Sequence, residues 1–229
     1  MREWLQDNVR DTLWNVVPRD HRDTSKRLHR RQMVTVAVVL IGAGILGYSL
    51  RIAPGSPEFY VATLALAGVW VAGALASGRL HLGRRLSGSR PILQPIATGL
   101  VLSAVFVVGS LVVREIEQLA RYVRSVLEYA DQGSMALLLV VTVVNGIAEE
   151  LFFRGAAYAA IPRHPVLWTT VAYVVSTLAT GNVMLAFAAI LLGTVCGLER
   201  RASGGVLAPI LTHVTWSTTM LFALPQLFA

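Results

Sequence analysis

Long apolar runs, rather than short alternating ones, dominate the pattern of this chain. Because roughly 20 residues in a helix cross a hydrocarbon core of about 30 Å, such runs are typical of membrane-spanning helices. Runs of spanning or near-spanning length occur at Met33–Leu50, Tyr60–Ser77, Ile92–Val113, Met135–Phe153, Leu167–Thr180, Val183–Leu198 and Val206–Pro225. The pattern therefore predicts an all-α, polytopic transmembrane helix bundle with about seven spans.

Two features between the runs add detail to this bundle. The fifth and sixth runs are short and only Gly181 and Asn182 separate them, which predicts a tight helical hairpin or a partly re-entrant pair. The segment from Arg114 to Ala130 carries Ile116, Leu119, Ala120, Val123 and Leu127 on one helical face. We expect that segment to lie along the outer membrane interface as an amphipathic helix.

Composition agrees with a membrane protein. Apolar residues make up 55% of the 229 residues and charged residues only 14%, against about 25% charged in typical soluble domains. The net charge of +7 does not indicate a nucleic-acid partner, because the basic residues lie between apolar runs instead of forming a face. Cys196 is the only cysteine, so no disulfide can form within the chain. The first run, beginning at Met33, is long enough to be an uncleaved membrane helix.

The distribution of basic residues predicts an orientation, because Lys and Arg accumulate in cytoplasmic loops. With the N-terminus cytoplasmic and the C-terminus outside, eight basic residues fall in the arm at residues 1–32. Eight more fall in the other cytoplasmic loops, namely Arg79, Arg84, Arg85, Arg90, Arg154, Arg163, Arg200 and Arg201. Outside lie Arg51, Arg114, Arg121 and Arg124. The strong bias makes this orientation self-consistent.

These patterns divide the chain into three parts. Residues 1–32 form a basic cytoplasmic arm whose Trp4, Leu5, Val9, Leu13 and Val17 recur near helical spacing, which indicates an amphipathic helix on the membrane surface or, alternatively, a solvated tail. Residues 33–134 contain three membrane helices and the interfacial helix. Residues 135–229 form a core of four membrane helices.

Ionisable residues within spans cost several kcal/mol unless they are paired, so they are functional candidates. Glu149 and Glu150 lie near the end of the fourth run, Arg154 follows, and His213 lies in the last run. Glu149 lies roughly 21 Å along its helix from Met135, which leaves it roughly 9 Å from the cytoplasmic boundary. His213 lies roughly 10 Å from the same boundary. We therefore expect Glu149 and His213 to meet at one depth.

The helical spacing assigns each of these residues a role. Glu150 and Arg154 are four residues apart and form a favoured ion pair, whereas Glu149 points about 100° away and stays free. Asn145 shares the face of Glu149 and can hydrogen-bond to it. A carboxylate facing an imidazole can activate water, either directly or through Zn²⁺ or another divalent metal held by His213 and Glu149. The alternative is structural: an interfacial ion pair, a solvated Glu149 and a histidine bonded to a backbone carbonyl.

The segment GIAEELFFRG, residues 146–155, resembles the E-E-x-x-x-R motif of the CAAX-processing and bacteriocin-processing (CPBP, or ABI) intramembrane proteases. The segment GGVLAPILTHVTWS, residues 204–217, resembles the stretch with that family's H-x-x-x-N motif, with His213 as its histidine. The resemblance implies a helix bundle with a cavity open to the cytoplasm. It also implies that Glu149 acts on, or helps to position, a water that attacks a peptide bond.

Two positions depart from the family pattern. Where the family has F-x-x-x-H, this chain has Leu178 and Asn182, and Ser217 stands where Asn is commoner in the last motif. Asn is a poor metal or proton-transfer group compared with imidazole. Asn182 also falls roughly 22 Å from the inner boundary, so either the fifth helix begins deeper, behind a re-entrant segment at 155–166, or Asn182 lies outside the site.

Three functions are compatible with these patterns. The first is an intramembrane endopeptidase acting on a membrane-associated or lipid-modified protein, in which Asn182 and Ser217 support His213 in binding a metal or the oxyanion. The second is a catalytically impaired family member that acts as a membrane scaffold or as an immunity or export partner. The third is a small transporter or channel subunit. A bacterial plasma membrane is the expected location, with the lipid bilayer and a protein or peptide substrate as partners.

Overall fold

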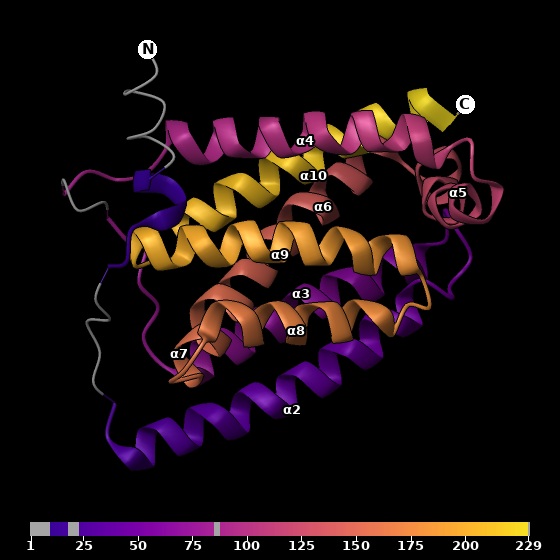
Figure 1. The fold of residues 1–229 in the computed structure, drawn as a ribbon. Coiled ribbons are helices and arrows are strands. Elements are labelled where there is room, and N and C mark those ends of the chain that lie inside the picture. Colours follow the sequence, from indigo (N-terminus) through magenta and orange to yellow (C-terminus); the bar gives the residue numbers. More distant parts are fainter. Residues whose placement is uncertain (1–9, 18–22, 85–87, 229) are drawn as a thin grey trace.

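The computed structural model describes residues 10–17, 23–84 and 88–228, and within these ranges the protein is a bundle of helices without a strand. Figure 1 shows the long helices running back and forth along the length of the bundle, with loops collected at its two ends. This arrangement confirms the predicted all-α class. It also leaves only helical backbone, whose hydrogen bonds are satisfied internally, across the middle of the molecule.

Each predicted apolar run is a helix, and six segments are long and apolar enough to cross a membrane. These six are α2 (Ser25–Ser49), α3 (Pro57–Ser77), α4 (Leu93–Val113), the continuous segment Met135–Ala160, α9 (Val183–Ser203) and α10 (Leu207–Phe228). The predicted fifth span is the shorter apolar helix α8, Pro165–Leu178, as its length in the sequence indicated. The short helix η1, Arg10–Trp14, precedes them all.

The fourth span extends further than predicted. It comprises α6 (Met135–Glu150), a π-helical stretch η2 (Leu151–Ala157) and α7 (Tyr158–Ala160), whereas the apolar run suggested an end at Phe153. Arg154 ends the run of apolar residues in the sequence but does not end the helix, because its charge is paired inside the bundle. π-helical turns are rare and occur frequently at functional sites.

The short helices α8 and α9 form the tight hairpin that the sequence predicted. Gly181 turns the chain in the left-handed region, at φ 75°, where glycine is favoured. Asn182 then caps α9, since its side chain accepts hydrogen bonds from the backbone N–H groups of Met184 and Leu185. The hairpin places α8 and α9 side by side, as Figure 1 shows.

The arm departs from the prediction at its C-terminal end. Helix α2 begins at Ser25, so the last residues of the expected arm are already helical. Arg31 is buried and forms a 3.0 Å ion pair with Asp23, instead of pointing into solvent. Residues 1–9 and 18–22 lie outside the described residues, so the predicted amphipathic helix with Trp4, Leu5 and Val9 stays a prediction.

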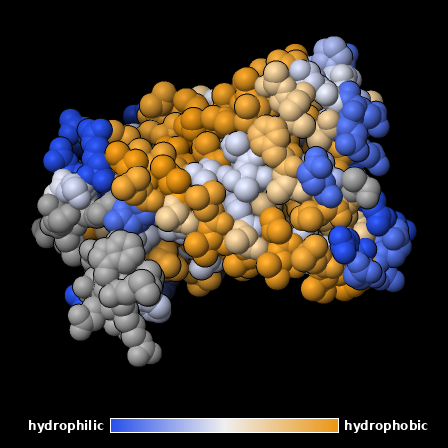
Figure 2. All heavy atoms as spheres, turned by 90° about the horizontal axis from the view of Figure 1, so that it is seen from above, coloured by the Kyte–Doolittle hydropathy of each residue, from blue (hydrophilic) through white to orange (hydrophobic). Residues whose placement is uncertain are grey.

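The surface of the bundle is divided into two polar ends and an apolar belt. Figure 2 shows hydrophobic residues over the middle of the visible face and hydrophilic residues gathered at both ends. Exposed apolar side chains such as Leu40, Val101 and Val175 belong to this belt. Helix α5, Glu117–Gln132, lies at one end, as expected of the interfacial helix. An integral membrane protein accounts for this distribution.

An aromatic cluster holds the fourth span against α3. The indole of Trp70 on α3 stacks on Phe152 with ring centroids 4.8 Å apart and lies 5.1 Å from the ring of Phe153. All three side chains are buried. Because Phe152 and Phe153 lie within one turn of Glu149 and Glu150, this packing fixes the part of the helix that carries the candidate carboxylates.

Candidate functional site

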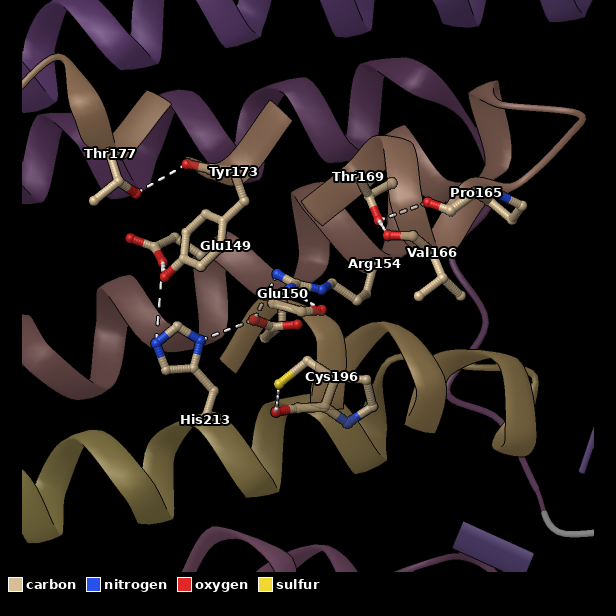
Figure 3. Close-up of polar contacts among 12 residues, drawn as sticks. Glu149, Glu150, Arg154, Pro165, Val166, Thr169, Tyr173, Thr177, Cys196 and His213 are labelled. Atoms are coloured by element: carbon tan, nitrogen blue, oxygen red, sulfur yellow. Dashed lines mark hydrogen bonds and ion pairs between the residues drawn. The ribbon is translucent and has the colours of Figure 1, made fainter. Parts of the chain in front are cut away.

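The four ionisable residues that the sequence singled out meet in one cluster between α6, η2 and α10. Glu149 and Glu150 end α6, Arg154 lies in η2, and His213 projects from α10 toward both glutamates (Figure 3). The predicted encounter of the fourth and last spans is therefore observed. The two glutamates, however, have different surroundings.

Glu150 is the structural centre of the cluster. Its Oε1 accepts a 3.0 Å hydrogen bond from Arg154 and lies 2.8 Å from Nδ1 of His213. The side chains of Glu150 and Arg154 are fully buried, so the ion pair that the i, i+4 spacing predicted is present without solvent screening. The contact between His213 and Glu150 was not predicted, because Glu149 was the expected partner of His213.

Glu149 is held more loosely. Its Oε2 accepts a 2.7 Å hydrogen bond from the hydroxyl of Tyr173 on α8 and lies 4.0 Å from Nε2 of His213. The Glu149 side chain keeps 14% of its surface exposed, against 0% for Glu150. A separation of 4.0 Å is too long for a hydrogen bond. Glu149 therefore faces the imidazole across a gap.

Arg154 ties the cluster to α9. Its guanidinium donates a 2.9 Å hydrogen bond to the carbonyl of Gly193 and lies 5.1 Å from the centre of the Tyr173 ring. The close approach requires a small residue, since a Cβ at Gly193 would lie 3.3 Å from the guanidinium. Arg200 in turn donates a 2.7 Å hydrogen bond to the carbonyl of Arg154.

Tyr173 is the site residue that sequence reasoning missed. It lies in the middle of α8 and joins Glu149 to the ring system of the core, with its ring centroid 5.0 Å from that of Phe153. The only available signal was a tyrosine inside an apolar run, and a buried tyrosine normally requires a hydrogen-bond partner. That signal does not identify which residue accepts the hydrogen bond of Tyr173.

Two predicted supporting residues make local contacts instead. The amide of Asn145 donates a 2.9 Å hydrogen bond to the carbonyl of Val141 and not to Glu149, because that carbonyl lies one turn earlier on the same helix. The hydroxyl of Ser217 lies 3.4 Å from the carbonyl of Val214 on its own helix. Neither contact reaches the Glu149 carboxylate.

Asn182 lies at the far end of α9 from the cluster. Besides capping α9, its amide donates a 2.7 Å hydrogen bond to the carbonyl of Tyr122 on α5. Asn182 is separated from Gly193, which contacts Arg154, by roughly 16 Å of helix at 1.5 Å per residue. Of the two placements that the sequence left open, the structure has the one in which Asn182 lies outside the site.

The donor groups of the cluster do not match a complete metal site. Catalytic zinc sites use three protein ligands, whereas Nδ1 of His213 faces Glu150 and leaves only Nε2 of His213 and the carboxylate of Glu149 as candidate donors. Among the described residues, no group of three or more His, Cys, Asp or Glu side chains is placed to hold a metal ion. Binding of Zn²⁺ or another divalent metal by His213 and Glu149 stays a prediction.

The fold and the cluster together define a polytopic membrane protein with a buried carboxylate and imidazole site. Residues 131–219 match the family model described as type II CAAX prenyl endopeptidase, Rce1-like, which confirms the CPBP resemblance over the segment that carries Glu149, Arg154 and His213. This match supports a CAAX-protease-like intramembrane peptidase in general. No curated protein and no solved structure matches the chain.

Proposed function

We propose that this protein is an intramembrane endopeptidase that cleaves a membrane-associated or lipid-modified protein with water activated by Glu149. The observation that carries the proposal is the 4.0 Å gap between Oε2 of Glu149 and Nε2 of His213. Two hydrogen bonds of about 2.8 Å span such a gap when one water lies between the two groups. We infer that the attacking water bridges the carboxylate of Glu149 and Nε2 of His213 in this way.

Glu149 can carry out both proton transfers that the hydrolysis requires. Glu149 takes a proton from the water as the resulting hydroxide attacks the carbonyl carbon of the peptide bond. The carbon–nitrogen bond then breaks, and Glu149 returns the proton to the leaving amine. The products are a new carboxyl terminus and a new amine, and Glu149 regains its charge.

His213 has the geometry to stabilise the oxyanion. With Nδ1–H donated to Glu150, the ring is fixed in orientation and Nε2 is directed toward the gap. When Nε2 also carries a hydrogen, His213 is a donor at both ring nitrogens. Its Nε2–H then donates to the oxygen that becomes negative in the transition state.

Tyr173 and Arg154 are positioning residues in this scheme. The Tyr173 hydroxyl orients one oxygen of Glu149, and Arg154 holds Glu150 in place for His213. Both act through another side chain. A positioned general base contributes typically about 10²–10⁴-fold to a rate, so loss of orientation alone costs a fraction of that factor.

One observation favours the second candidate function, a catalytically impaired member that binds membrane proteins without cleaving them. The family motif places a histidine where this chain has Asn182, and Asn182 contacts α5 instead of the cluster. In that case Glu149 and His213 would line a binding site only. The two candidates differ in whether a peptide bond is broken.

The test uses the purified full chain in proteoliposomes with prenylated peptides that end in a CAAX sequence. The proposal predicts cleavage by the wild type and its loss in Glu149→Ala, while Glu128→Ala, an exposed glutamate on α5, cleaves like the wild type. Binding without cleavage by the wild type would support the scaffold instead. Equal cleavage by Glu149→Ala and the wild type would contradict the role of Glu149.

A further inference from the structure

A large cavity lies apart from the Glu149 and His213 cluster, at the bundle end predicted to be cytoplasmic. Its volume is about 1100 Å³, larger than most small-molecule pockets. Segments far apart in the sequence form its walls: Val16 and Val17, the loop after α3, Tyr158 in α7, the start of α8 and the end of α9. Neither Glu149 nor His213 lines it.

The polar lining of this cavity carries one sign of charge. Four arginines contribute to it, Arg84, Arg90, Arg200 and Arg201, and none of the described lining residues is acidic. Arg200 is buried and holds the Arg154 carbonyl, whereas Arg84 and Arg90 are exposed at the rim. The Nε of Arg201 is buried without a hydrogen-bond partner. Such a concentration of guanidinium groups favours an anion with several acceptor oxygens.

The start of α8 adds a second, independent attraction for an anion. Helix α8 begins at Pro165 next to the cavity, and its N-cap His164 makes no side-chain capping hydrogen bond. The backbone N–H groups of a helix's first turn and the positive end of its dipole together favour negative charge. Val166 and Leu167, in that first turn, line the cavity. The helix terminus and the arginines therefore act on the same space.

Backbone hydrogen bonds hold the wall that carries Arg84 against the end of α9. The backbone N–H of Arg84 donates a 2.8 Å hydrogen bond to Ser203, and the N–H groups of Val206 and Leu207 donate to His81 and Leu82. The two segments approach so closely that a Cβ at Gly205 would lie 2.0 Å from the nitrogen of Gly83. This pairing fixes the loop after α3 against the end of α9, next to Arg200 and Arg201.

Apart from the arginines, the lining contains polar side chains such as His81 and Thr170 and apolar ones, and its apolar part continues onto the exposed surface of the bundle. Leu82 and Leu167 line the cavity and are 52% and 57% exposed, and Trp168 beside them is 53% exposed. A free phosphate would leave these side chains uncovered. Acyl chains would cover them, and tryptophan is enriched at the level of lipid headgroups.

We propose that this cavity binds the phosphate headgroup of an anionic membrane phospholipid, with the acyl chains along Leu82 and Leu167. The phosphate lies between the arginines and the first turn of α8. Anionic lipids are concentrated in the cytoplasmic leaflet, the side on which the basic loops place this end of the bundle. The proposal does not depend on peptidase activity, because it concerns binding alone.

The test measures lipid retention by the purified full chain in native mass spectrometry after incubation with phosphatidylglycerol or phosphatidylcholine. We expect phosphatidylglycerol to be retained in preference to phosphatidylcholine. The double variant Arg84→Gln/Arg90→Gln should bind phosphatidylglycerol on the order of tenfold more weakly. The control Arg51→Gln/Arg121→Gln removes two exposed charges from the opposite end and should bind like the wild type.

Three results would overturn the proposal. Equal weakening in both double variants would indicate an unspecific effect of net charge. Equal retention of the two lipids would show that the arginines do not select an anionic headgroup. Full displacement of phosphatidylglycerol by excess inorganic phosphate would assign the site to a free anion. Because Arg84 and Arg90 are exposed, both double variants should unfold at the wild-type temperature without added lipid, which checks that they fold.

Discussion

At the scale of single residues, the two adjacent glutamates differ in their surroundings rather than in their chemistry. Glu150 is fully buried between Arg154 and His213, whereas Glu149 is partly exposed and held by the Tyr173 hydroxyl. The buried pair is neutralised within the protein, and the partly exposed carboxylate can meet a substrate. This difference in surroundings supports the proposal that Glu149 is the base.

Removing the Tyr173 hydroxyl should lower the rate without unfolding the protein. A hydrogen bond to a charged group contributes about 1.5–3 kcal/mol, so Tyr173→Phe should reduce kcat on the order of tenfold and leave KM unchanged. Tyr48→Phe, on the exposed face of α2, is the control and should have no effect. The measurement is steady-state cleavage of a membrane-anchored peptide. A changed KM with an unchanged kcat would assign Tyr173 to substrate binding instead.

The sequence predicted which residues form most of the cluster but not all of the hydrogen bonds among them. Helical spacing was sufficient for the Glu150–Arg154 pair, and span depth was sufficient for the meeting with His213. Neither argument could predict that Tyr173 binds Glu149, because that contact depends on how α8 is rotated about its axis. Asn145 was assigned to Glu149 on spacing alone, and a nearer backbone carbonyl takes its amide.

At the scale of elements, Asn182 belongs to the turn between α8 and α9. Losing an N-cap side chain costs typically about 1 kcal/mol, so Asn182→Ala should lower the thermal stability of the protein. Asn182→Asp keeps the acceptor oxygen for the first turn of α9 and should be less destabilised. Cleavage per folded molecule should stay at the wild-type rate in both variants. A selective loss of cleavage with unchanged stability would show that Asn182 takes part in catalysis.

The contact between α2 and α3 offers a matched pair of glycines. A Cβ at Gly42 would lie 2.1 Å from the Trp70 ring, whereas at Gly44 nothing lies within 4 Å. Overpacking of this kind costs typically about 1–3 kcal/mol, so Gly42→Ala should lower the unfolding temperature. Gly44→Ala should leave it unchanged or raise it slightly, because alanine favours helix. Equal effects in the two variants would show that Trp70 moves aside without cost.

The elements themselves were largely predictable. Apolar runs located every long helix, and the brevity of the fifth run indicated the short α8. The end of the fourth span was placed too early, at Phe153, since a hydropathy criterion ends a helix at a charge even where the charge is paired. The start of α2 was placed too late for the same reason, as Arg31 pairs with Asp23 inside the fold.

At the scale of the whole molecule, the orientation in the membrane follows from the basic loops alone and stays a prediction. Single cysteines placed at the two ends in a Cys196→Ala background test it. In sealed right-side-out vesicles, an impermeant thiol reagent should label Glu128→Cys on α5 and leave Arg163→Cys unlabelled. Both positions are exposed in the fold. The reverse labelling pattern would invert the proposed topology.

The central claim is that Glu149 breaks peptide bonds in membrane proteins. Its most direct test is a comparison of newly generated protein termini in membranes from cells that express the wild type, Glu149→Gln, Glu128→Gln or an empty vector. Termini shared by the wild type and Glu128→Gln but absent from the other two samples are the predicted result. If Glu149→Gln, inserted at the wild-type level, produces the same termini as the wild type, Glu149 is not the catalytic base.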